Sequence, residues 1–161
     1  MKQIFSILLI INSLSTFCQS FNEDKTAFTN FVKRMYNADP FEGIKVIDDY
    51  DHQYFMSVIS LETSKYTNPS TMNRVAQLKA QSQANVFFNG SSISSDLIIK
   101  TTDQKIENSN STIVETIESI KENALGFSQG MELLINFDDL DGKRMVFIYY
   151  REIKKDTESK Q

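Results

Sequence analysis

The chain has 161 residues, of which 40% are hydrophobic and 24% are charged, and its formal net charge is −4. This composition is ordinary for one globular domain and argues against wholesale disorder. No run of lysine and arginine alternates with aromatic residues, so the sequence does not predict a nucleic-acid-binding face.

The first twenty residues have the three parts of a secretory signal peptide. Lys2 supplies a positive charge, residues 4–11 are almost entirely apolar, and small and polar residues follow up to Ser20. The apolar run is too short to span a bilayer. We therefore expect residues 1–20 to be a bacterial export signal that is cleaved near Cys18. The alternative is a buried strand or helix at the start of the domain.

Cys18 is the only cysteine, and it raises the question of lipidation. A lipoprotein signal acylates a cysteine that follows a leucine and two small residues, whereas Phe17 directly precedes Cys18 here. Lipidation of Cys18 is therefore the minor alternative, and we expect membrane association only if it occurs. If cleavage removes Cys18, the mature chain has no thiol for disulfides, metal binding or nucleophilic catalysis.

The first half of the mature chain predicts a helix, a hairpin and a second helix. Apolar residues recur at helical spacing over residues 22–38, which end at Asp39-Pro40. Two apolar runs, 44–47 and 54–61, flank the polar residues 48–52 and predict a β-hairpin. A second helix is expected over residues 71–88, and Asn89-Gly90 is typical of its end. Its small residues repeat every four positions, which lets a helix lie close to a sheet or to another helix; they are Ala76, Ala80 and Ala84.

The second half predicts mostly strands. Residues 91–101 are expected to form a strand, and residues 103–111 a loop. Residues 112–125 fit either a helix or a strand, and the abundance of threonine, isoleucine and valine slightly favours a strand. Gly126 and Gly130 indicate a bulge or bend. Strands 131–137 and 145–150 flank Asp141-Gly142, which is a strong hairpin signal.

This order of elements predicts an α+β fold with a mostly antiparallel sheet and two helices packed on one face. We expect a single domain over residues 21–153, followed by a charged tail over residues 154–161.

Three segments resemble the small envelope-lipoprotein domain related to the amino-terminal domain of flagellar assembly protein T. They are the alanine-spaced helix Arg74–Ala84 that closes on Asn89-Gly90, the strand Ser92–Ser95, and the segment Ala124–Met131 that leads into the Asp-Gly hairpin and Tyr149. The resemblance covers about half the chain and rests on packing motifs. It implies an α+β envelope domain without catalytic residues, although Cys18 departs from the lipoprotein pattern.

His52 is the only histidine, and Asp48, Asp49 and Asp51 lie beside it. Catalytic zinc usually needs three protein ligands, so we interpret these residues as a solvated turn and expect neither a metal nor a cofactor. Residues 138–142 have the aspartates of a calcium loop but lack the ligand spacing of an EF-hand. The hairpin interpretation is therefore preferred over a calcium site.

Four aromatic residues of the carboxyl-terminal half are either core residues or a surface for a partner. They are Phe127, Phe147, Tyr149 and Tyr150. Strand alternation puts Phe147 and Tyr149 on one face and Tyr150 on the other. Core packing is the default interpretation.

These observations favour a non-catalytic exported protein, periplasmic or associated with the outer membrane. We expect it to act through contact with an envelope protein or through self-association. One alternative is a periplasmic binding protein for a small apolar or peptide ligand. A second alternative is a hydrolase that uses His52.

Overall fold

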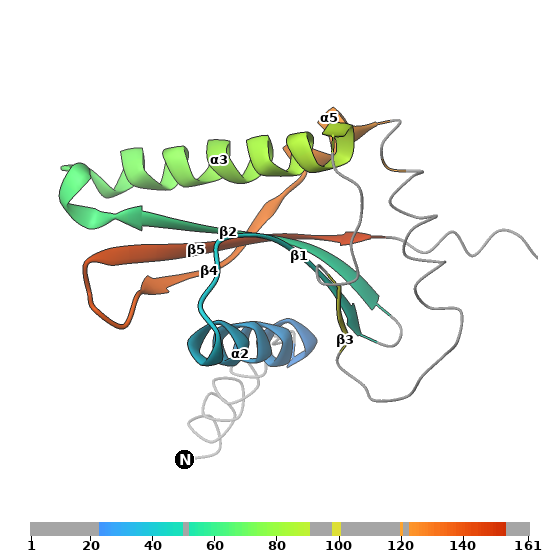
Figure 1. Cartoon of the computed structure of the whole chain (residues 1–161), viewed down its shortest axis with the longest axis horizontal. Helices are drawn as coiled ribbons and strands as arrows, with labels where there is room; N and C mark the ends of the chain where they lie inside the picture. The colour runs from blue at the N-terminus through green and yellow to red at the C-terminus, as the bar shows by residue number, and fades with distance from the viewer. Residues whose placement is uncertain (1–22, 50–51, 91–97, 101–119, 121–122, 154–161) are drawn as a thin grey trace, which may run out of the picture. The chain divides into compact units, whose positions relative to one another are not determined.

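The computed structural model describes residues 23–49, 52–90, 98–100, 120 and 123–153 (Figure 1). The predicted signal peptide, Cys18 and the charged tail lie outside these residues. The chain divides into two compact units, Met1–Ala38 and Asp39–Gln161, which are described separately. The first contains helix α2 (Glu23–Ala38), and the second contains the sheet with its helices.

Helix α2 confirms the helix that was predicted over residues 22–38. Its buried side chains are Phe28, Val32 and Tyr36, which are spaced four residues apart and therefore lie on one face of the helix. Apolar periodicity was a sufficient signal here, because α2 follows a regular 3.6-residue repeat up to the residues before Pro40.

The second unit is a five-stranded sheet with the order β3-β1-β2-β5-β4. Its strands are β1 (Gly43–Asp49), β2 (His52–Glu62), β3 (Ile98–Lys100), β4 (Glu132–Asp138) and β5 (Arg144–Ile153). Neighbouring strands are antiparallel except for β1 and β3, which are parallel. The predicted α+β class with a mostly antiparallel sheet is confirmed, and so are both predicted hairpins, β1–β2 and β4–β5.

The central pairing joins β2 to β5, which are far apart in the sequence. It runs in continuous register from Gln53 opposite Ile153 to Glu62 opposite Arg144. Side chains on both faces of β2 are buried, from Phe55 to Leu61. This explains why apolar residues of β2 occupy positions on both faces of the sheet rather than every second position.

Helix α3 (Pro69–Gly90) lies along one face of the sheet (Figure 1). Ala76, Ala80 and Ala84 are fully buried, which confirms the predicted close approach of this helix. The buried hydroxyl of Ser57 on β2 donates a 2.7 Å hydrogen bond to Oε1 of Gln83, so the contact is polar as well as apolar. A short 3-10 helix, η1 (Thr63–Lys65), connects β2 to the segment before α3.

Helix α5 (Ala124–Gln129) corrects the prediction for this region. A strand was slightly favoured through residue 125, and a bulge or bend was expected between Gly126 and Gly130. The segment instead forms one short helix. The side chain of Asn123 accepts a hydrogen bond from the Gly126 N–H and so caps the helix start. Residues 112–119, the larger part of the ambiguous stretch, lie outside the described residues.

Arg151 on β5 holds α5 against the sheet. Its Nη1 donates hydrogen bonds to the carbonyl oxygens of Gly126 and Phe127, at 2.8 and 2.6 Å. Its guanidinium carbon also lies 4.6 Å from the centre of the Phe127 ring. A Cβ atom at Gly130 would overlap this guanidinium, which explains a glycine at that position.

Two further boundaries differ from the predictions. Asp48, Asp49 and His52 were expected in a solvated turn, but they lie within β1 and β2, with Asp49 opposite His52. Asp48 is buried, and its Oδ1 lies 3.4 Å from Nε2 of Gln53. Residues 50 and 51, which connect the strands, lie outside the described residues.

We predict that Ala80→Leu destabilises the fold, because Ala80 is fully buried where α3 approaches the sheet. Overpacking at such a site costs about 1–3 kcal/mol. Urea unfolding measures the difference in free energy of unfolding. The control is Ser82→Leu, which adds a leucine to the exposed side of the same helix and should change stability by less than about 0.5 kcal/mol. Equal effects of the two substitutions would contradict the close packing of α3.

Candidate functional site: the outer edge of the sheet

Strand β4 forms one edge of the sheet and pairs, among the described residues, only with β5. Its seven residues run from Glu132 to Asp138 and include the apolar residues Leu133, Leu134, Ile135 and Phe137. The Leu133 side chain is 40% exposed. The strand contains no lysine, arginine or proline, the residues that commonly protect an edge from pairing with another chain.

A β-bulge divides this edge into two parts. The register of β4 against β5 shifts between Leu133 and Ile135, so Leu134 is the extra residue. From Ile135 to Asp138 the pairing is regular again. A bulge bends its strand and limits pairing across it. The carboxyl-terminal half of β4 is therefore the part with a regular ladder for another strand to follow.

The turn that connects β4 to β5 is closed by its own aspartates. The Gly142 N–H donates to the carbonyl oxygen of Asp139 at 2.9 Å, and Gly142 has a φ of 65°, which favours glycine. The carboxylates of Asp139 and Asp141 accept hydrogen bonds from the N–H groups of Leu140 and Lys143. The predicted hairpin is confirmed, and these carboxylate oxygens stabilise the turn.

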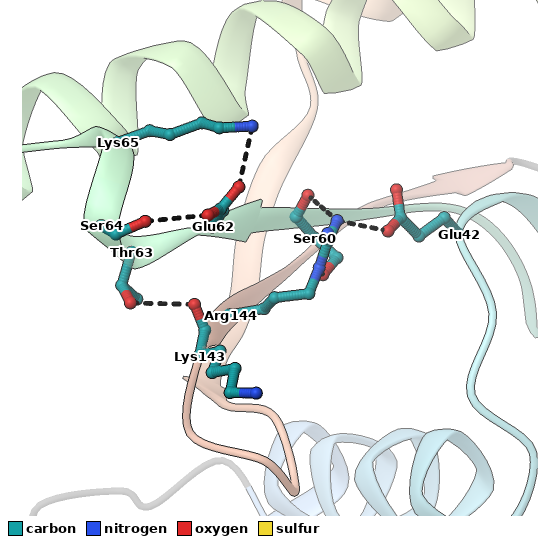
Figure 2. Close-up of polar contacts among 8 residues, drawn as sticks. All are labelled: Glu42, Ser60, Glu62, Thr63, Ser64, Lys65, Lys143 and Arg144. Carbon is teal, nitrogen blue, oxygen red and sulfur yellow. Dashed lines mark hydrogen bonds and ion pairs between the residues drawn. The ribbon is translucent and has the colours of Figure 1, made fainter.

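Arg144, directly after this turn, connects β5 to β2 and to the segment before β1 (Figure 2). Its Nε donates to Oγ of Ser60 at 2.6 Å, and its Nη2 donates to the Ser60 carbonyl oxygen at 2.9 Å. Nη2 also lies 2.8 Å from Oε1 of Glu42. A guanidinium shared by three acceptors holds this end of the β4–β5 hairpin in place.

The start of η1 also contacts the hairpin turn (Figure 2). The backbone N–H and the hydroxyl of Thr63 both donate to the carbonyl oxygen of Lys143 at 2.9 Å. Next to it, Nζ of Lys65 lies 2.8 Å from Oε2 of Glu62, and the Ser64 hydroxyl donates to Oε1. The hydrogen bonds from Lys65 and Ser64 lower the pKa of Glu62 below its ordinary value of 4.5, and the same carboxylate raises the pKa of Lys65.

His52 contacts a carboxylate that the sequence did not single out. Its Nδ1 lies 2.8 Å from Oε1 of Glu152 on β5, and both side chains are about half exposed. Since an ionised carboxylate only accepts hydrogen bonds, Nδ1 is the donor in this pair. The ring also stacks on Tyr54, with 6.0 Å between centroids. The pair orients the imidazole, which is one of the parts that a nucleophilic hydrolase needs.

The four aromatic residues proposed as a partner surface divide between the two faces of the sheet. Phe127, Phe147 and Tyr149 are buried in the core on the side of α3. Tyr150 is half-buried and lies against Tyr54, which confirms its place on the other face. Burial raises the pKa of Tyr149, whose hydroxyl donates to the Asn73 carbonyl oxygen at 3.4 Å. For the three buried rings, packing is therefore the observed role.

Within the described ranges, no group of three or more histidine, cysteine, aspartate or glutamate side chains is placed to hold a metal ion. No helix in the same ranges has the length and apolarity needed to cross a membrane. Comparison of the chain with protein-family models, with curated proteins and with solved structures gives no match. The resemblance to the envelope-lipoprotein domain stays a prediction.

We predict that Lys65→Met removes a pH-dependent contribution to stability. Because the pKa of Glu62 is lowered in the folded chain, its contribution is present above pH 4.5 and is lost as the pH falls through the lowered value. The free energy of unfolding of the wild type should therefore exceed that of Lys65→Met near pH 7. The difference between the two should vanish at about pH 2. Urea unfolding at both pH values measures this.

The matched control for this prediction is Lys79→Met, which removes an exposed lysine from α3. Its effect on stability should not follow the titration of Glu62. A difference between wild type and Lys65→Met that stays constant down to about pH 2 would contradict the assigned cause.

Proposed function

We propose that this chain is a non-catalytic, exported protein of the bacterial envelope that acts through protein–protein contact or self-association at the edge formed by β4. The observation that carries the proposal is the position of β4 at the edge of the sheet, where β5 is its one neighbour among the described strands, together with its partly exposed leucine, Leu133. Edge strands bind extended segments by adding a strand to the sheet, in which main-chain hydrogen bonds supply the affinity.

The rigidity of β4 supports this function. The strand begins after α5, which Arg151 holds against the sheet, and it ends in a turn closed by Asp139 and Asp141. Arg144 holds the far end of the same hairpin through Ser60 and Glu42. An edge that is already in its binding conformation loses little conformational entropy when a partner strand is added.

The leader supports export, and the absence of known catalytic motifs in the sequence supports a binding role. Residues 4–11 form the apolar region of a signal peptide, and small and polar residues follow it. The resemblance to an envelope-lipoprotein domain supports the same location. Neither a serine nucleophile motif nor a phosphate-binding glycine loop is found in the sequence.

We predict that a photo-crosslinking amino acid at position 133 captures a protein in native cells, because Leu133 lies on the binding edge. The control is the same amino acid in place of Leu78 on α3, which is more exposed than Leu133, at 57% against 40%, but lies away from the edge. Mass spectrometry of the adducts identifies a partner or a second copy of the chain. A lack of adducts at position 133, or the same adducts from both positions, would contradict a binding role for β4.

We predict that the exported protein begins after Cys18, at about residue 21, because the residues before Cys18 do not fit the lipoprotein pattern. Mass spectrometry of the protein purified from the envelope fraction gives the amino-terminal residue and detects an acyl group. A mature chain that begins with acylated Cys18 would show membrane anchoring instead. Intact chain with Met1 in the cytosol would contradict export.

A further inference from the structure

We infer that the strand added to β4 is β4 of a second copy of this chain, paired in antiparallel orientation about a two-fold axis at Phe137. This inference rests on the proposed binding role of the β4 edge and identifies its partner. It follows from the backbone groups that β4 directs away from β5 and from the side chains that lie beside them.

The pairing of β4 with β5 determines which of its backbone groups face outward. The Asp139 N–H donates to the carbonyl oxygen of Arg144 at 2.8 Å, so these two residues form a hydrogen-bonded pair. Bonded and non-bonded pairs alternate along an antiparallel ladder. Along the register of β4, Phe137 is therefore bonded to β5, whereas Asn136 and Asp138 belong to non-bonded pairs. Asn136 and Asp138 thus direct their N–H and C=O groups away from β5.

A two-fold pairing of this edge has few possible registers. The ladder of β4 is regular from Ile135 to Asp138, and the bulge interrupts it before Ile135. A two-fold axis pairs the edge strand with itself in antiparallel orientation. Residues that direct their backbone groups outward must then lie opposite each other, because only such residues bond across the new ladder. Three registers satisfy this condition, and they are centred on Asn136, on Phe137 and on Asp138.

The register centred on Phe137 uses the outward groups most fully. Asn136 of each copy lies opposite Asp138 of the other, which gives two bonded pairs within the regular ladder. When the pairing is centred on Asn136, Asp138 lies opposite Leu134 in the bulge. When it is centred on Asp138, Asn136 lies opposite Leu140 in the turn, beyond the end of β4. Each of these two registers therefore keeps one regular bonded pair.

The side chains favour the same register. Asn136 and Asp138 are both exposed, and they lie opposite Phe147 and Met145, so they share the α3 face of the sheet. In the register centred on Phe137, the amide of Asn136 can donate to the carboxylate of Asp138 in the second copy, and the two-fold axis repeats this contact. Nδ2 of Asn136 lies 4.0 Å from Sδ of Met145, a weak acceptor that does not compete with a carboxylate.

The register centred on Asp138 places two carboxylates directly opposite each other, which is destabilising. Backbone geometry and side-chain chemistry therefore select the same pairing, in which β4 is complementary to itself. A ladder with two bonded pairs buries a small area, so self-association should be weak and depend on concentration. Since each copy uses β4 itself, the assembly closes at two copies.

The test measures self-association of the full exported chain by sedimentation velocity at concentrations up to about 1 mM, where weak interfaces associate. The wild type should form a reversible dimer. Asn136→Asp should weaken it about tenfold at low salt, because a carboxylate then lies opposite Asp138 in both pairs, and added salt should reduce the difference. The control Gln77→Glu adds the same charge to an exposed position of α3 and should change the affinity less than about twofold.

The double variant Asn136→Asp/Asp138→Asn provides the decisive comparison, because it exchanges the two side chains and keeps the net charge of the wild type. An amide again lies opposite a carboxylate in the register centred on Phe137, so the affinity should return to within about threefold of the wild type. The same exchange would weaken a dimer centred on Asn136 and strengthen one centred on Asp138. Circular dichroism confirms that each variant is folded.

Each result separates the identity of the partner from the binding role of β4. A wild type that stays monomeric at about 1 mM, a dimer that Asn136→Asp does not weaken, or a double variant without recovered affinity would overturn the inferred pairing. Adducts of a different protein at position 133 would then leave the edge as a binding site. A monomer that gives no adducts at position 133 would overturn the binding role of β4 as well.

Discussion

The contact between Phe55 and three other phenylalanine rings is the interaction on which the rest of the sheet unit depends. Phe55 on β2 is fully buried, and its ring centroid lies 5.4, 4.9 and 5.6 Å from those of Phe87, Phe88 and Phe127. These rings come from the sheet, from the end of α3 and from α5. Tilted and edge-to-face packing of this kind contributes beyond the burial of apolar area.

This cluster determines where the edge strand begins. Phe127 anchors α5, and β4 starts three residues after the end of that helix, beyond Gly130 and the buried Met131. Arg151 holds the same helix through its carbonyl groups, so an apolar and a polar contact fix its position together. The hairpin that carries the proposed binding edge is therefore supported at one end by the core and at the other by Arg144.

Local sequence patterns predicted the elements whose conformation is set by residues close together in the sequence. The alanine repeat of α3 and the Asp-Gly turn of the β4–β5 hairpin were both recognised, because each needs only neighbouring residues. No local sequence signal predicts the pairing of β2 with β5. The same is true of the contact between His52 and Glu152, because these two residues are 100 positions apart in the sequence. The sequence contains both partners of such contacts but does not show that they meet.

Helix α5 was predicted incorrectly for a related reason. The helix has only six residues, Gly126 lies within it and Gly130 follows it, and it has no long apolar repeat, so propensity alone favours a bend. Its stability comes from Arg151 and from the ring cluster, both of which belong to other elements. Tertiary contacts therefore decide the conformation of this segment, as they commonly do for short helices.

The bulge at Leu134 decides how much of the β4 edge can pair regularly with another chain. An exposed strand with an apolar centre is a hazard, because identical copies can pair along it. The bulge interrupts the ladder between Leu133 and Ile135, so a regular ladder continues only from Ile135 to Asp138. It also turns Glu132 and Asp138 to opposite faces of the sheet, since Glu132 lies opposite Tyr150 and Asp138 opposite Met145. The bulge thus leaves a short segment of backbone for a partner strand and at the same time limits the length over which further copies can pair.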